Sequence, residues 1–217
     1  MDNATNTIGL LFTGGDGPTA RQILSIVEEA RSRCGSEPVL AAADSGLLLV
    51  QKAGLDPHWI IGDMDSVNSD NLRPYPPETI LTFPKAKDFT DTELALSHLS
   101  EKGCKRIWII GGGGGRIDHL FALRSLFERE QIPERWITSA EDIHCLEAQT
   151  KLNTQTNGNI SVFPLGDGPW EAESTGLRWP LAGLPWTRGF FGISNEAPSG
   201  DFTITVKKGR FLVVLPL

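Results

Sequence analysis

The distribution of apolar and polar residues divides the chain into two parts. Up to about residue 140, short apolar runs alternate with segments whose apolar residues recur at helical spacing. The predicted strands are Ile8–Thr13, Val39–Ala43, Trp59–Ile61, Thr79–Phe83, Arg106–Ile110 and Arg135–Ser139. The predicted helices are Thr19–Arg33, Thr90–Lys102 and Arg116–Glu130. Alternating strands and helices indicate an α/β domain with a mostly parallel sheet covered on both faces.

After about residue 140 the helical spacing disappears. Glycine, proline, threonine and tryptophan residues separate short runs of alternating apolar and polar residues, of which the clearest are Ile160–Pro164, Phe202–Lys207 and Phe211–Pro216. This pattern predicts antiparallel strands in a small sandwich or barrel. We therefore expect a three-layer α/β domain over residues 1–140 and an all-β, sandwich-like domain over residues 141–217.

The composition is that of a folded protein and disfavours several functional classes. The chain has 217 residues, 40% of them hydrophobic and 22% charged, which is enough for a sizeable core. Its net charge of −7 is unfavourable for binding duplex nucleic acid, which requires Lys and Arg against phosphates. A local basic pocket for a small phosphorylated ligand is compatible with that charge. The three cysteines form no C-x-x-C pair, so zinc ribbons and thioredoxin-type sites are unsupported.

The N-terminal stretch MDNATNTIGLLFTGGDG carries no targeting signal that we recognise. It has no basic region, and its apolar run of about five residues is too short for a signal peptide or a membrane span. We therefore expect a cytoplasmic protein that does not associate with membranes.

Carboxylates gather at the predicted strand ends. The positions are Asp44, Asp63, Asp65, Asp88, Asp91 and Asp118. In an open α/β sheet the loops after the strands open onto one edge, so residues far apart in sequence can converge there. Oxygen ligands without cysteine or paired histidine favour a hard cation, and Mg²⁺ is commonly held by a few carboxylates together with substrate phosphates.

Single aspartates at such positions also have a purely structural explanation. Asp44 can simply cap a helix that begins near Gly46. The pair Asp63-x-Asp65 is harder to explain in this way, because one cap needs only one carboxylate. We therefore interpret this pair as a metal or phosphate site.

The segment FTDTELAL combines a helix start with candidate chemistry. Thr90 and Glu93 have the spacing of a capping box, which accounts for both residues structurally. Asp88 and Asp91 are not needed by that motif. Asp91 gains from the helix dipole in the first turn and is equally available to a metal or to the cation of a bound phosphate.

Two further stretches offer candidate contacts for a ligand. In GGGGGRIDH the glycines allow a close backbone approach and Arg116 offers a guanidinium suited to phosphate, although the stretch lacks the G-K-[ST] of a Walker A motif. In the C-terminal part, Trp179 can be a core residue or can stack on a flat or cationic ring. For Ser194 and Asn195 a turn alone is a sufficient structural explanation.

The order of these motifs resembles that of thiamine pyrophosphokinases. The stretches are DSG, GDMDS, KDFTDTELAL, GGRIDH, GLRWPL and ISNE, and the resemblance extends from about Asp44 to the last residue. It departs at Phe89, where a basic or polar residue is frequent, and in the first 40 residues, which match only in pattern. The purpose of the TGGDG loop in that segment is left open.

The resemblance implies a fold, a reaction and an assembly. The expected fold is an N-terminal α/β domain followed by a C-terminal β-sandwich. The expected reaction moves a pyrophosphoryl group from ATP to the hydroxyethyl oxygen of thiamine, giving thiamine diphosphate and AMP, with Mg²⁺ as cofactor. The expected assembly is a homodimer, with each active site between the α/β domain of one subunit and the β domain of the other.

The resemblance also implies roles for particular residues. The catalytic and metal-binding group is expected to comprise Asp44, Asp63, Asp65 and Asp91. The residues expected beside the ATP phosphates are Asp88, Thr90, Arg116 and Asp118. Trp179, Ser194 and Asn195 are expected on the thiamine side.

Two alternative functions are compatible with the same residues. A nucleotide-sugar transferase would use the D-x-D pair to hold a divalent cation on a diphosphate. A non-catalytic sensor would bind thiamine or thiamine diphosphate without releasing AMP. Formation of AMP from ATP and thiamine distinguishes the proposed reaction from both.

Overall fold

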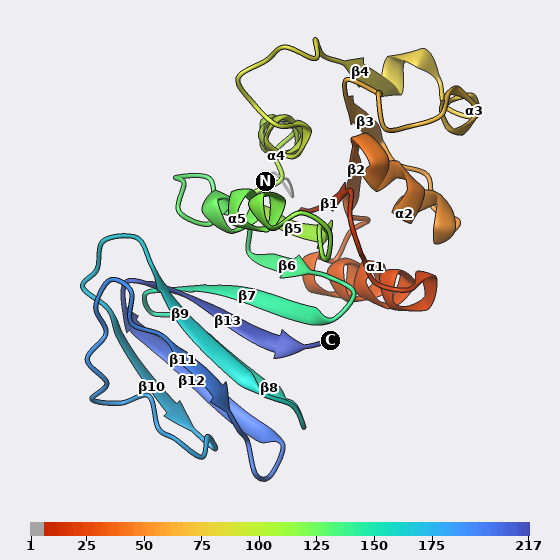
Figure 1. Cartoon of the computed structure of the whole chain (residues 1–217). Coiled ribbons are helices and arrows are strands. Elements are labelled where there is room, and N and C mark those ends of the chain that lie inside the picture. The colour runs from red at the N-terminus through yellow and green to blue at the C-terminus, as the bar shows by residue number, and fades with distance from the viewer. Residues whose placement is uncertain (1–6) are drawn as a thin grey trace, which may run out of the picture. The chain divides into compact units, whose positions relative to one another are not determined.

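The computed structural model describes residues 7–217, which form two compact units (Figure 1). The first unit contains the chain up to Leu126 together with Trp136–Ala140. The second unit contains Phe127–Arg135 and Glu141–Leu217. Among the described residues, we find no helix with the length and apolar character needed to cross a membrane.

The first unit is built on a sheet with the strand order β6-β5-β1-β2-β3-β4. Its strands are β1 (Ile8–Thr13), β2 (Val39–Ala43), β3 (Trp59–Gly62), β4 (Ile80–Thr82), β5 (Arg106–Gly111) and β6 (Arg135–Ile137). The central strand β1 pairs in parallel with β2 and β5, and β3 pairs in parallel with β2 and β4. The predicted mostly parallel sheet is confirmed.

Helices lie on both faces of this sheet. They are α1 (Ala20–Cys34), α2 (Leu47–Lys52), α3 (Ser69–Leu72), α4 (Asp91–Glu101) and α5 (Ile117–Leu126), with short 3₁₀ turns η2 (Asp44–Gly46) and η3 (Pro77–Thr79). Leu10 and Phe12 of β1 are buried in one cluster with Ile23 of α1 and Leu47 of α2. On the other face Gly9 leaves room for α4, since a Cβ there would lie 3.1 Å from Leu99 Cδ1. The first unit therefore has three layers.

Side-chain caps explain where the two long helices begin. The Thr90 hydroxyl accepts a hydrogen bond from the Glu93 N–H, and the Thr90 N–H donates to the Glu93 carboxylate, which confirms the predicted capping box at α4. Thr19 and Gln22 form the same motif at α1. These caps set the direction in which α4 leaves the edge of the sheet.

The second unit consists of two antiparallel sheets with the orders β11-β9-β13-β7 and β10-β12-β8. Its strands are β7 (Glu141–Glu147), β8 (Lys151–Gln155), β9 (Ile160–Leu165), β10 (Glu171–Thr175), β11 (Gly192–Asn195), β12 (Asp201–Lys208) and β13 (Arg210–Pro216). Phe211 and Val213 of β13 share a buried cluster with Ile204 and Val206 of β12, so side chains of both sheets form one core. The predicted antiparallel β domain is confirmed.

Gly46 holds the turn after β2 against β1. Its φ of −56° is ordinary, but a Cβ at this position would collide with the backbone carbonyl of Phe12. We expect Gly46→Ala to destabilise the protein by about 1–3 kcal/mol, because a fully packed position cannot take an extra methyl group. Urea unfolding measures the loss, and Gly192→Ala is the control, since a Cβ there would lie 4.0 Å from Trp186, an ordinary van der Waals distance. Equal stability of the two variants would contradict the expectation.

Candidate active site

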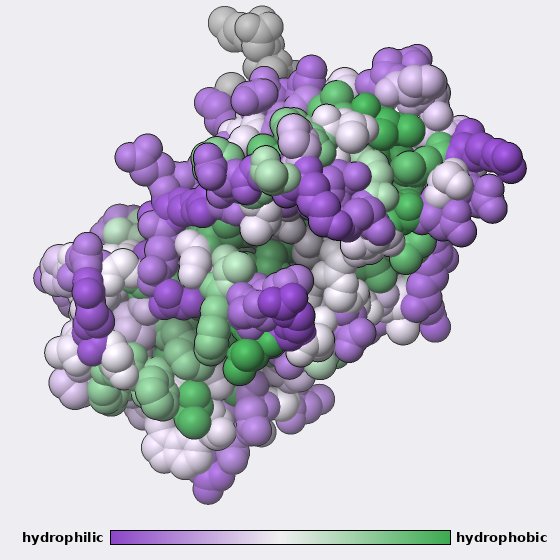
Figure 2. Space-filling view, turned by 45° about the horizontal axis from the view of Figure 1, so that its top comes forward, coloured by the Kyte–Doolittle hydropathy of each residue, from purple (hydrophilic) through white to green (hydrophobic). Residues whose placement is uncertain are grey.

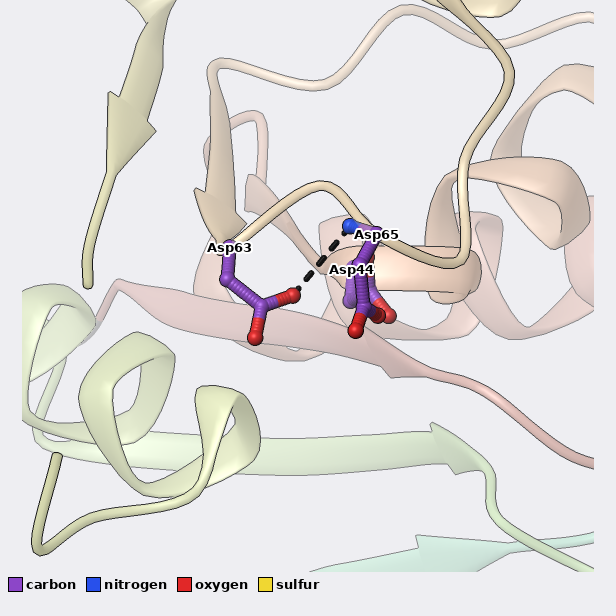
Figure 3. Close-up of side chains that lie close together, drawn as sticks. All are labelled: Asp44, Asp63 and Asp65. Carbon is purple, nitrogen blue, oxygen red and sulfur yellow. Dashed lines mark hydrogen bonds between the residues drawn. The ribbon is translucent and has the colours of Figure 1, made fainter. Parts of the chain in front are cut away.

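Three carboxylates come together where β2 and β3 end. Asp44 follows β2, and Asp63 and Asp65 follow β3. One oxygen from each of the three side chains lies within 4.8 Å of the others, and Figure 3 shows the carboxylates of all three pointing to the same side of the backbone. The prediction that these residues converge is confirmed by geometry, because neighbouring parallel strands end at the same edge.

The backbone around this cluster is bent rather than extended. Asp44 and Met64 have φ values of 45° and 61°, which residues other than glycine rarely adopt. The Asp65 N–H donates a 3.2 Å hydrogen bond to Asp63 Oδ1, drawn as the dashed line in Figure 3. Met64 is partly buried against the core of the first unit. The residue between the two aspartates therefore anchors a turn that presents both carboxylates.

Asp91, at the first position of α4, belongs to the same group. Gly62 at the end of β3 lies between Asp91 and Asp44 and allows them to be close, since a Cβ on Gly62 would lie 3.2 Å from both Asp44 Cβ and Asp91 Cγ. The hydroxyls of Thr13 in β1 and Thr92 in α4 lie 2.7 Å apart and hold the start of α4 against the sheet. The four aspartates predicted as a group are thus neighbours.

Two lysines from the loop between β4 and α4 neutralise part of this acidic cluster, by which we mean Asp44, Asp63, Asp65 and Asp91. Lys85 forms an ion pair with Asp65. Lys87 Nζ lies 3.0 Å from Asp91 Oδ1 and 3.7 Å from Asp63 Oδ2. Although burial lowers the pKa of Lys87, the charges of Asp91 and Asp63 outweigh it and raise the pKa overall.

The carboxylates of the acidic cluster differ in their electrostatic surroundings. Burial, followed by the charges of Asp91 and Asp63, raises the pKa of Asp44 above its usual value, and a hydrogen bond from Ser66 opposes the rise. The hydrogen bond from Lys85 lowers the pKa of Asp65. Residues of the protein therefore stabilise the charge of Asp44 less well than the charge of Asp65.

The acidic cluster fits a hard divalent cation. Asp44 Oδ1 is buried and accepts no hydrogen bond from residues 7–217, so the fold leaves this oxygen without a protein partner. The available ligands are carboxylate oxygens, which Mg²⁺ prefers. The alternative in which Asp44 only caps a helix is wrong, because α2 begins at Leu47 with Gly46 as its N-cap residue and without a side-chain cap.

The residues predicted beside the ATP phosphates lie at the starts of α4 and α5. Arg116 Nε donates a 3.1 Å hydrogen bond to Asp118 Oδ1, and the guanidinium and carboxylate form an exposed ion pair at the start of α5. The Thr90 hydroxyl is used in the cap of α4, and Asp88, two residues earlier, is exposed. The structure thus pairs Arg116 with Asp118 and shows Thr90 and Asp88 beside the aspartate that opens α4.

The glycine run at 111–115 has a structural explanation. The Asp16 N–H donates to the Gly113 carbonyl at 2.7 Å, and the Gly113 N–H donates back to the Asp16 carbonyl at 2.9 Å. A Cβ on Gly113 would lie 2.8 Å from that same Asp16 carbonyl, and one on Gly114 would collide with the Asp16 carboxylate. The TGGDG loop, whose purpose the sequence left open, therefore packs on the loop after β5.

On the predicted thiamine side, Asn195 fixes the backbone of Trp179. Asn195 Oδ1 accepts hydrogen bonds from the N–H groups of Trp179 and Glu196 at 3.2 and 2.8 Å, and its Nδ2 donates to the Trp179 carbonyl at 2.7 Å. Trp179 is 53% exposed, and the Arg178 guanidinium lies 5.1 Å from the centroid of its ring. Ser194 is exposed and has a φ of 59°. Trp179 is therefore not a core residue.

We expect Asn195→Ala to destabilise the second unit by about 1–3 kcal/mol, because it leaves the polar backbone groups of Trp179 without partners. Thermal unfolding measures the effect. Asn153→Ala is the matched control, since the Asn153 side chain accepts one exposed hydrogen bond from Thr203. Equal losses of stability in the two variants would show that the hydrogen bonds to Trp179 contribute no more than one exposed hydrogen bond.

Sequence reasoning missed Lys85, Lys87 and Gly62 as parts of this site. The two lysines carry a signal, the repeat K-A-K directly before the helix start, but their role depends on the loop after β4 returning to the end of β3. Gly62 opens the motif GDMDS, but its place between Asp44 and Asp91 exists only in three dimensions.

Two family comparisons cover most of the chain. Residues 31–134 match the family described as "Thiamin pyrophosphokinase, catalytic domain", and residues 144–211 match "Thiamin pyrophosphokinase, vitamin B1 binding domain". The chain belongs to the thiamine pyrophosphokinase family. The resemblance of the ordered motifs is confirmed, and membership of this family agrees with an α/β unit followed by an antiparallel β unit.

Individual relatives agree with the family. Over 179 residues the chain is 28% identical to thiamine pyrophosphokinase of Bacillus subtilis (strain 168), covering 79% of this chain and 84% of the relative. The crystal structure of thiamine pyrophosphokinase from Bacillus subtilis is similar with a TM-score of 0.73 and 25% identity, over 97% of this chain and 98% of the other. Yeast thiamin pyrophosphokinase shares the fold, with a TM-score of 0.68 and 16% identity over 97% and 86%.

Proposed function

We propose that the protein transfers a pyrophosphoryl group from ATP to the hydroxyl of thiamine, giving thiamine diphosphate and AMP. The observation that carries this proposal is the convergence of Asp44, Asp63 and Asp65 within 4.8 Å, in a chain that matches both the catalytic and the vitamin B1 binding family. A nucleotide-sugar transferase and a non-catalytic sensor gain no support from those family matches. Residues 1–140 form the proposed ATP- and magnesium-binding domain, and residues 141–217 the proposed thiamine-binding domain.

We assign the metal-binding and catalytic role to the acidic cluster. Asp44, Asp63, Asp65 and Asp91 would hold Mg²⁺, which when bound neutralises charge on the polyphosphate of ATP. As the thiamine oxygen bonds to the β-phosphorus and the bond to the AMP oxygen breaks, a carboxylate of the acidic cluster accepts the hydroxyl proton. Positioning and charge neutralisation supply most of the catalysis in phosphoryl transfer.

The remaining candidate residues would bind and orient the two substrates. We propose that four residues line the ATP phosphates: Asp88, Thr90, Arg116 and Asp118. The planar Arg116 guanidinium can donate two hydrogen bonds to one phosphate group. The exposed ring of Trp179 suits the cationic thiazolium ring of thiamine. We propose that Ser194 and Asn195 also contribute to the thiamine side, where Asn195 holds the Trp179 backbone.

The test is a coupled assay for AMP with purified protein, ATP, Mg²⁺ and thiamine as the varied acceptor. We expect AMP and thiamine diphosphate in equal amounts, and neither product without thiamine. A second reaction containing a nucleotide sugar tests the transferase alternative, which requires release of a nucleoside diphosphate. Binding of thiamine without any AMP would instead support the sensor and contradict the proposed reaction.

We also propose that two copies associate in the cytoplasm and share their active sites. Each unit leaves large apolar side chains exposed, including Ile117 and Phe121 in α5 and Phe191 and Ile193 at β11. Apolar residues also reach the surface on the face shown in Figure 2. Contiguous exposed apolar surface is typical of interaction sites.

Mixing two inactive variants tests the shared site. We expect neither Asp63→Asn nor Trp179→Ala alone to support normal turnover. If Asp63 of one subunit works with Trp179 of the other, a mixed dimer contains one site with both native residues and regains activity. Dimers in which each site belongs to one subunit regain none, and that result would contradict the shared site.

A further inference from the structure

Lys87 occupies an unusual place for a lysine. Its side chain is only 14% exposed, although Lys is among the residues that are seldom buried without a partner. Its ammonium lies between two carboxylates of the acidic cluster, 3.0 Å from Asp91 Oδ1 on α4 and 3.7 Å from Asp63 Oδ2 after β3. The side chains of Asp63 and Asp91 are themselves 14% and 22% exposed. One sheltered cation thus contacts carboxylates from two separate elements.

Lys85 provides a direct comparison. It stands two residues earlier in the same loop and pairs with Asp65, but its side chain is 78% exposed. Solvent and salt screen an ion pair of that kind, so it contributes little. The Lys87 contacts are shielded, so their loss should affect the protein more strongly.

The acidic cluster needs a cation whether or not a metal is bound. Gly62 keeps Asp44 and Asp91 close, and Asp44 Oδ1 has no hydrogen-bond partner among residues 7–217. Like charges this close repel one another. Lys87 supplies a fixed positive charge on the Asp63 and Asp91 side of the cluster, while the three oxygens of Asp44, Asp63 and Asp65 form the candidate cation site.

We propose that Lys87 is a built-in counter-ion of the acidic cluster. Its ammonium holds Asp63 and Asp91 in position when no divalent cation is bound, and it competes with a divalent cation for those carboxylates. Lys87 is thus a positioning residue that sets the cation affinity of the free protein. This inference rests on the proposed metal-binding role of the acidic cluster.

The experiment compares Lys87→Met, Lys87→Arg and Lys85→Met with the unchanged protein. Lys87→Met and Lys85→Met remove the same charge, so Lys85→Met is the matched control, and Lys87→Arg keeps the charge. Thermal unfolding in EDTA measures stability without metal. Calorimetric titration with Mn²⁺ in the absence of ATP measures cation affinity.

We expect Lys87→Met to unfold several degrees lower in EDTA. Its Mn²⁺ affinity should rise by about tenfold or more, because the competing charge is gone. Added Mn²⁺ should then close the gap in unfolding temperature. Lys87→Arg should stay near the unchanged protein, and Lys85→Met should change less than Lys87→Met in both measurements. If Lys87→Met does not fold, Lys87→Gln replaces it in both measurements.

Three results with Lys87→Met would overturn the inference. Unchanged stability and affinity in Lys87→Met would show that the contacts are unimportant, and weaker Mn²⁺ binding would show that Lys87 assists the cation rather than competing with it. Equal effects of Lys85→Met and Lys87→Met would show that only the net charge matters and that the position of Lys87 does not. If the unchanged protein binds no Mn²⁺, the proposed metal site and the competition both fail, whereas unfolding in EDTA still reports separately on the counter-ion role.

Discussion

Asp63→Asn is expected to lower AMP formation by about a hundredfold or more while the protein stays folded. Asparagine keeps the side-chain oxygen that can accept the hydrogen bond from the Asp65 N–H, so the turn after β3 is retained. It removes the charge that faces Lys87 and that contributes to the candidate cation site. The measurement is steady-state release of AMP with ATP, thiamine and Mg²⁺, alongside thermal unfolding.

The control for this variant is Asp70→Asn. Asp70 lies in α3, and its exposed side chain pairs with Arg73 at 3.4 Å, so the same chemical change is made away from the acidic cluster. We expect its turnover to match that of the unchanged protein. Near-normal AMP formation by Asp63→Asn would contradict the metal-binding role assigned to Asp63.

Asp142→Asn is expected to cost about 3–5 kcal/mol of unfolding free energy. Arg135 Nε and Nη2 each donate a 2.6 Å hydrogen bond to the Asp142 carboxylate, and His144 Nε2 lies 3.1 Å from it. The side chains of Arg135 in β6 and of Asp142 and His144 in β7 are all largely buried. The substitution leaves a buried guanidinium facing a neutral amide, which costs far more than loss of an exposed pair.

Urea unfolding of Asp142→Asn measures this loss. Asp167→Asn is the matched control, because Asp167 pairs with Arg188 in a highly exposed ion pair. We expect the control to stay within about 0.5 kcal/mol of the unchanged protein. Similar losses in the two variants would show that burial of the Asp142 pair is unimportant.

Acidification should narrow the difference between the unchanged protein and Asp142→Asn. Burial alone would raise the pKa of Asp142, but His144 and Arg135 outweigh it and hold the pKa well below its usual value. A carboxyl whose pKa is depressed in the folded state stabilises the protein above its unfolded pKa of about 4, and this contribution is lost as the pH falls further. The variant lacks this contribution at any pH, so a constant gap from pH 7 down to pH 3 would contradict the assignment.

The longer elements were predictable because burial leaves a clear pattern in them. β1, β2 and β5 are buried on both faces and read as continuous apolar runs, and α1 and α4 carry capping boxes at their starts. The helices α2 and α3 have 6 and 4 residues and are shorter than the window that reveals helical spacing. The start of α2 was therefore considered only through the possible cap near Gly46, and α3 was missed. β8 was missed because KLNTQ is polar at most positions.

The sequence by itself determined that carboxylates stand at the strand ends, and their order along the chain indicated the family. Asp63 and Asp65 are two residues apart, so their proximity follows from the chain itself. Asp44 and Asp91 join them only because β2, β3 and α4 meet at one edge of the sheet, with Gly62 between the two side chains.

Tertiary structure alone decided how the charge of this group is balanced. Lys85 and Lys87 are the same residue type, two positions apart in K-A-K. Lys85 is nevertheless exposed beside Asp65, whereas Lys87 is sheltered between Asp63 and Asp91. The physical reason is that electrostatic interactions depend on distance and on solvent access, neither of which local sequence specifies.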